Sequence, residues 1–417
     1  MPREDDARAR DAAATVARRS YGKLVAFLAA RTRDVAGAED ALAEAFAAAL
    51  ADWPVQGVPE RPETWLLTVA RRRMIDASRR RRTTVNGVEH LRLIADELDA
   101  AAGADADIPD DRLRLMFACA HPALDSGIRA PLMLQTVLGV DAATIASAFL
   151  VAPATMSQRL VRAKSKIKEA GIPFRVPERT ELRERLGAVL EAIYAAFAEG
   201  WTDPGGTDTR RRDLADEAIW LGRLVVALLP DEPEALGLLA LMLHAEARRA
   251  ARRTADGAYV PLAEQDPSTW DAGSIAEAEE LLRRAGALDA IGRYQLEAAV
   301  QSAHAIRRLT GRADWHAIER LYDAIVALTG SPVAAVNRAV AVAECRGAAA
   351  GLGVLDAVAD DPRLATHQPY WAARAVLLAN TGAIAAADAA YERAIGLERD
   401  PAVRTFLQTR RAALRAG

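Results

Sequence analysis

Residues 144–168 read TIASAFLVAPATMSQRLVRAKSKIK, and this stretch decides the fold class. Pro153 stands in its middle, and proline is common in the first turn of a helix. Two short helices joined by a tight turn form a helix-turn-helix. We therefore predict this motif here, with a second helix that starts at Pro153 and stops before Gly171. Its apolar positions recur at helical spacing: Ile145, Phe149, Met156, Leu160, Ala163 and Ile167.

The outward side of the second helix is polar and cationic. A recognition helix needs short polar groups at its start for base edges and cations further along for phosphates. This pattern predicts a helix that enters the DNA major groove, and an ordinary αα-hairpin is the alternative. The candidate contacts are Thr155, Ser157, Gln158, Arg159, Arg162, Lys164 and Lys166.

A second basic segment lies upstream, at the end of a helix predicted to open near Pro62. Residues 71–82 carry seven arginines against one aspartate. Like charges three or four residues apart destabilise an isolated helix, so this run favours a polyanionic partner over a solvated face. Trp65 is expected either to stack on an unpaired base or to pack in the core. The candidates here are Trp65, Arg71, Arg72, Arg73, Asp76, Arg79 and Arg80.

Charge and composition divide the 417-residue chain into an all-α series of domains. Residues 1–180 carry a formal charge of +3 and residues 181–417 one of −6. We predict a helical DNA-binding domain over 1–82, an acidic flexible linker over 83–110 and the helix-turn-helix domain over 111–172. Residues 180–417 are rich in alanine and are expected to form a tetratricopeptide-like helical array. The surface of such an array would bind a partner protein or a small ligand. Its clearest repeat signal is Trp371, Ala375, Leu378, Ala387, Tyr391 and Ala394.

Several function classes are disfavoured. The two cysteines, Cys119 and Cys345, are too few for a disulfide framework or a four-thiolate zinc site. Cys119 beside His121 is best interpreted as a small core thiol at a helix end. Phosphate-loop and nucleophile-elbow motifs are missing, so we expect no enzyme, metal or cofactor. The apolar runs are too short for a membrane span or export signal, which predicts a cytoplasmic protein.

Three segments together resemble the RNA polymerase sigma-70 superfamily. They are EDALAEAF at 39–46, TWLLTVARRRMID at 64–76 and the end of the basic helix at 159–164. The chain is most similar to the extracytoplasmic-function (ECF) branch, and in particular to members with a tetratricopeptide-like C-terminal extension. The stretches DDRLRL at 110–115 and ACAHP at 118–122 are also similar to that branch.

This resemblance implies a non-enzymatic factor that binds core RNA polymerase and directs it to promoter DNA. The helix with Asp40, Leu42, Glu44 and Phe46 would dock on the polymerase. The segment from Trp65 to Arg80 would meet and open the −10 element, and the helix from Pro153 would bind the −35 element. A DNA-binding regulator or adaptor, and a cytosolic helical scaffold, are the alternative interpretations.

Overall fold

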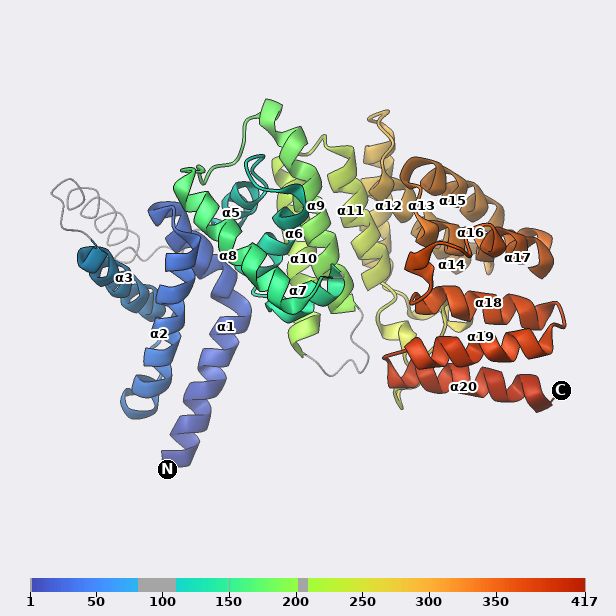
Figure 1. Cartoon of the computed structure of the whole chain (residues 1–417), viewed down its shortest axis with the longest axis horizontal. Coiled ribbons are helices and arrows are strands. Elements are labelled where there is room, and N and C mark those ends of the chain that lie inside the picture. Colours follow the sequence, from blue (N-terminus) through green and yellow to red (C-terminus); the bar gives the residue numbers. More distant parts are fainter. Residues whose placement is uncertain (1, 82–109, 150, 202–208, 417) are drawn as a thin grey trace. The chain divides into compact units, whose positions relative to one another are not determined.

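The computed structural model describes residues 2–81, 110–149, 151–201 and 209–416 (Figure 1). Regular structure in these ranges is helical, apart from one isolated bridge between Arg253 and Tyr259. The predicted all-α fold is confirmed. The chain divides into two compact units, the first made of Met1–Gly200 with Asp213–Leu221 and the second of the remainder. In the described ranges, no helix is long and apolar enough to cross a membrane.

The first unit begins with three helices: α1 (Pro2–Thr32), α2 (Val35–Gln56) and α3 (Pro62–Arg81). They pack on one another through fully buried leucines, among them Leu24, Leu42 and Leu66. Asp34 caps α2 by accepting a hydrogen bond from the Gly37 amide, as short polar residues before a helix commonly do. Helix α2 continues through Pro54 to Gln56, and Gly57, which has a φ of 87°, follows as its C-cap.

Within residues 110–149 and 151–201 the structure describes five further helices, and four of them form the region with the predicted helix-turn-helix. α7 and α8 pack together, and α8 begins at Pro153 as predicted. Met156, Leu160, Ala163 and Ile167 are all buried, which confirms the helical spacing of these positions. The helices are α5 (Arg112–Cys119), α6 (Ser126–Thr136), α7 (Ala142–Ala148), α8 (Pro153–Glu169) and α9 (Arg179–Trp201).

The two basic segments belong to one packed body, because α1 contacts α5 and α6 and α2 contacts α8. A Cβ on Gly22 of α1 would lie 1.7 Å from the carbonyl oxygen of Val137, so the backbones meet at the glycine. Asp111 accepts a hydrogen bond from Arg31 of α1 at 3.0 Å. The predicted flexible linker lies outside the described residues except for Asp110.

The second unit is a succession of packed helices. Helix α18 packs on α19 and α19 on α20, as Figure 1 shows, whereas α13 packs on α11 more than on α12. Ala375, Ala387, Tyr391 and Ala394 of the predicted repeat signal are buried there. The likeness to tetratricopeptide repeats stays a prediction. The helices are α11 (Pro233–Glu246), α12 (Ala272–Gly286), α13 (Arg293–Ala305), α14 (Arg307–Thr310), α15 (Trp315–Thr329), α16 (Pro332–Arg346), α17 (Ala348–Asp356), α18 (Gln368–Asn380), α19 (Ile384–Leu397) and α20 (Pro401–Ala416). Helix α10 (Thr209–Leu228) contributes to both units.

Candidate nucleic-acid and polymerase interface

Helix α3 presents a cationic face on the side opposite its core contacts. Leu66 and Ala70 are fully buried, while Arg72, Arg73 and Asp76 are exposed. Arg71 differs from its neighbours because it is half-buried, with its Nε shielded from solvent. Leu66 and Ala70 therefore face the core, and Arg72 and Asp76 face away from it. The side chains of Arg79 and Arg80 lie outside the described part of the chain.

Trp65 occupies a position between the two expectations for it. Its ring is half-buried and meets Trp53 of α2 edge-on, with ring centroids 5.6 Å apart. Trp53 is 2% exposed and belongs to the core. One side of the Trp65 ring is thus fixed by the protein, while the other part stays accessible, as a stacking platform for a base requires.

The predicted polymerase-binding residues of α2 divide into accessible and inaccessible positions. Asp40 and Glu44 are exposed and Phe46 is half-buried. Leu42 is fully buried between the helices and supports α2 from inside, so it offers no surface to a partner. Glu44 forms an ion pair with Arg73 of α3 at 3.3 Å, which joins the predicted polymerase face to the predicted −10 face.

Helix α8 exposes the polar start of its predicted recognition face. Thr155, Ser157 and Gln158 are exposed, as are Arg159 and Arg162. Val161, which the sequence pattern did not single out, is 64% exposed within this cationic surface. The sequence could have indicated this exposure, because Val161 lies outside the stripe of apolar residues that α8 buries. Exposed apolar groups on recognition helices contact thymine methyl groups, so Val161 fits the same face.

Two of the three lysines at the other end of α8 form ion pairs with carboxylates at the start of α2, whereas the predicted DNA contact Lys166 is exposed. Lys164 pairs with Glu39, and their side chains are 11% and 14% exposed. Lys168 pairs with Asp34, with side chains 51% and 18% exposed. We call these two pairs the α2–α8 clasp. It withdraws the predicted DNA contact Lys164 from solvent in this conformation.

The surroundings of Glu39 are electrostatically unusual. Burial raises the pKa of Glu39, and the Lys164 ammonium opposes that rise only in part. Tyr21 lies close by, and burial together with the charges of Glu39 and Asp40 raises the pKa of its hydroxyl above the ordinary value. The clasp therefore places the Glu39 carboxylate where it is poorly solvated. The charged form of Glu39 depends on Lys164 for its stability.

The DDRLRL stretch that resembles the ECF branch has a structural role. Arg112 is 8% exposed, forms ion pairs with Asp110 and Glu217 and lies over the ring of Trp220 at 4.1 Å. Asp111 binds both Arg31 and Arg114. This segment fixes the start of α5 to α1 and α10.

Cys119 and His121 match the structural interpretation given above. Cys119 is fully buried at the end of α5, with its Sγ 3.7 Å from the Thr136 Oγ1, and burial raises the pKa of the thiol to about 12. The Nδ1 of His121 accepts a hydrogen bond from the Ala123 amide at 3.1 Å. The buried thiol and the ring next to it are therefore held by ordinary packing and hydrogen bonds.

A group of metal-ligating side chains that the sequence did not reveal occurs in the second unit. The ligand atoms of His316, Glu319 and Cys345 lie within 4.8 Å of one another. Arg346 forms an ion pair with Glu319, and this guanidinium already neutralises the carboxylate that a cation would need. The negative charge of Glu319 in this cluster is therefore already paired with the positive charge of Arg346.

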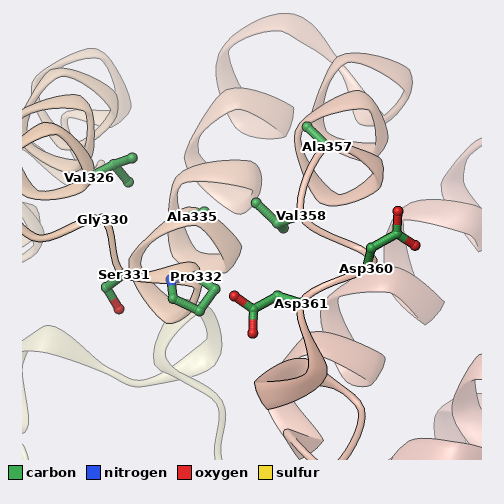
Figure 2. A pocket seen from close by; sticks show the side chains of 9 residues that line it. All are labelled: Val326, Gly330, Ser331, Pro332, Ala335, Ala357, Val358, Asp360 and Asp361. Atoms are coloured by element: carbon green, nitrogen blue, oxygen red, sulfur yellow. The ribbon is translucent and has the colours of Figure 1, made fainter.

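A small pocket of about 260 Å³ opens where the α15–α16 turn meets the segment after α17 (Figure 2). Figure 2 shows Asp361 across from Pro332. Asp361 caps the following 3-10 turn and binds Arg363, while Ser331 caps α16. The polar side chains of Asp361 and Ser331 therefore act as helix caps.

Two segments of the chain match known protein families. Residues 16–84 match the model of sigma-70 region 2, and residues 185–286 match a family of unknown function (DUF6596). The chain is 40% identical over 364 residues to the uncharacterized protein R00370 of Rhizobium meliloti (strain 1021), which covers 86% of each chain. No solved structure matches the chain. The region 2 match spans α2, α3 and most of α1.

Proposed function

Because residues 16–84 match sigma-70 region 2, we propose that the chain is an ECF-type promoter-specificity factor of RNA polymerase that performs no catalysis itself. The match to region 2 gives it a sigma-factor-like role in transcription initiation. The observation that carries the finer proposal is the pair of exposed cationic helix faces, on α3 and on α8, within one compact unit. One of these helices lies in the region 2 match and the other outside it.

Each face would contribute a different part of promoter recognition. On α3, Arg72 and Arg73 would contact phosphates of the −10 element while Trp65 stacks on an exposed base. On α8, the start of the helix would contact base edges of the −35 element. Each contact is weak alone, but tethering both to one polymerase raises their effective concentration at neighbouring sites. Unstacking a base costs a few kcal/mol, which the stacking and phosphate contacts would offset.

Reconstituted transcription tests this proposal. Purified core RNA polymerase with the chain is expected to start at a discrete site on DNA upstream of genes that its overexpression induces. Arg72→Glu is expected to abolish promoter opening, because it reverses an exposed charge on α3, while polymerase binding is retained. Arg320→Glu makes the same change at an exposed position of α15 and is the matched control. Unchanged initiation by Arg72→Glu would show that α3 does not contact the promoter.

Polymerase binding has its own test. Asp40→Arg is expected to weaken co-purification with core polymerase, because Asp40 is exposed on the predicted docking face of α2. Asp52→Arg changes the same charge near the end of α2 and is the control. Equal retention of both variants by core polymerase would favour a DNA-binding adaptor over a specificity factor.

A further inference from the structure

The second unit contains a cavity of about 1070 Å³ lined by residues of α13–α16 and of the segments around them. This volume is at the upper end of what small-molecule sites enclose. Its wall combines the aromatic side chains Trp315 and Tyr322 with the cationic side chains Arg248 and Arg307. A large cavity with a few convergent polar groups is the usual form of a ligand site.

The two arginines are held by uncharged acceptors. Arg248 donates to the carbonyl oxygen of His244 and to the side-chain oxygen of Gln301. Arg307 donates to the carbonyl oxygens of Leu262, at 2.7 Å, and Ala263, at 3.1 Å. Within the described ranges, neither guanidinium forms an ion pair with a carboxylate, which is unusual for arginines that are mostly enclosed.

The two guanidinium groups are neighbours of one buried aromatic ring that lies outside the cavity wall. Both guanidinium groups lie within 6 Å of the centroid of the same ring, that of Trp270, at 5.9 Å and 5.8 Å. Burial and the two arginines lower the pKa of His304, another wall residue, to about 4, so this imidazole is neutral at pH 7. Burial and the neighbouring Arg252 also lower the pKa of Arg248, to about 10. The lowered pKa of His304 thus has burial as its first cause and the positive charges of Arg248 and Arg307 as its second.

The carboxylates of the wall do not offset the positive charge of the two arginines. Asp314 is exposed and caps α15 by accepting a hydrogen bond from the Ala317 amide at 2.9 Å. Glu344 is exposed near the end of α16. A metal cation is disfavoured by the same arginines, whereas an anion would supply the negatively charged partner that neither guanidinium has among the described residues.

We propose that this cavity binds a small organic anion, with its carboxylate or phosphate group between Arg248 and Arg307 and its apolar part against Trp315. A guanidinium presents a planar fork of donors that matches both of these groups. The site lies in the second unit, and it does not depend on the role proposed for α3 and α8. Ligand binding would give this unit a sensory input.

Calorimetric titration of the full chain tests the proposal. The probes are inorganic phosphate and citrate, each in chloride buffer of matched ionic strength, up to about 10 mM, which is tenfold above a millimolar Kd. We expect saturable binding of one probe with one site per chain. Binding of phosphate alone identifies a phosphate-bearing ligand, and binding of citrate alone identifies a carboxylate. Failure of both probes to bind overturns the proposal.

Matched arginine variants locate the site. Arg307→Gln is expected to weaken binding by about tenfold to a hundredfold, as loss of a charged hydrogen-bond donor does. Arg308→Gln removes the same charge at the exposed neighbouring position outside the cavity wall and should change the Kd less than about twofold. Arg248→Lys keeps the charge but loses the fork, and it provides a second variant if Arg307→Gln fails to fold. Equal weakening by Arg308→Gln would overturn the assignment.

Discussion

Removal of one carboxylate from the α2–α8 clasp is expected to change how this protein binds DNA on its own. Glu39→Gln leaves the Lys164 ammonium almost enclosed, with an uncharged partner. Breaking a fully buried pair costs about 3–5 kcal/mol, and an exposed pair contributes about 0–1 kcal/mol. With side chains 11% and 14% exposed, the Glu39–Lys164 pair lies nearer the buried limit, and we assign the loss about 2 kcal/mol. The Asp34–Lys168 pair is half-exposed and contributes about 0.5 kcal/mol.

A loss of about 2 kcal/mol shifts the equilibrium between the clasped and released states of α8 by roughly thirtyfold. Released α8 exposes two further lysines to phosphates, so the slope of log K against log salt should steepen by about one to two. The assay is fluorescence anisotropy of a duplex that carries the −35 element, measured at several salt concentrations. We expect Glu39→Gln to tighten binding by up to about thirtyfold and to steepen this slope.

Glu44→Gln is the matched control, because it removes the same charge from α2 but its partner is Arg73 of α3. This pair is exposed, so the change in affinity should stay below about fivefold. Far-UV circular dichroism of both variants checks that they are folded. If Glu39→Gln binds DNA with the affinity and salt slope of the wild type, or if Glu44→Gln gains as much, the clasp does not control access to α8.

Two further predictions concern stability. His244 and His304 each have a pKa lowered to about 4 by burial, so the unfolded chain takes up protons below pH 6.5 while the folded chain does not. The free energy of unfolding should therefore fall between pH 7 and pH 5 by about 2 kcal/mol for each histidine, as urea titrations at both pH values can measure, and His304→Gln should remove about half of that fall. Gly22→Ala should destabilise the first unit by more than about 2 kcal/mol in thermal melts, because its Cβ would overlap the Val137 carbonyl. Gly187→Ala, on the open side of α9, should instead stabilise by about 0.5–1 kcal/mol. Equal effects of the two glycine substitutions would contradict the close approach of α1.

The sequence was informative where a function depends on positions within one helix. The spacing of Met156, Leu160, Ala163 and Ile167 was enough to orient α8. Periodicity reports which side of a helix is buried, because that side is apolar whatever it packs against.

Features made by distant segments could not be predicted in this way. Glu39 and Lys164 are 125 residues apart, and only the packing of α2 on α8 brings them together. The burial of Leu42 follows from its position between neighbouring helices, although the family resemblance suggested a polymerase contact. The cavity likewise combines Arg248 and Arg307, which no local pattern connects.

The ion pair between Glu44 and Arg73 gives the first unit a direct energetic link between two surfaces. Both side chains are about half-exposed, at 61% and 48%, so separating them costs at most about 1 kcal/mol. A protein that takes hold of Glu44 frees the Arg73 guanidinium for a phosphate, and by reciprocity a phosphate on Arg73 frees Glu44. The two events can favour each other by up to about fivefold, without any movement of the helix backbones.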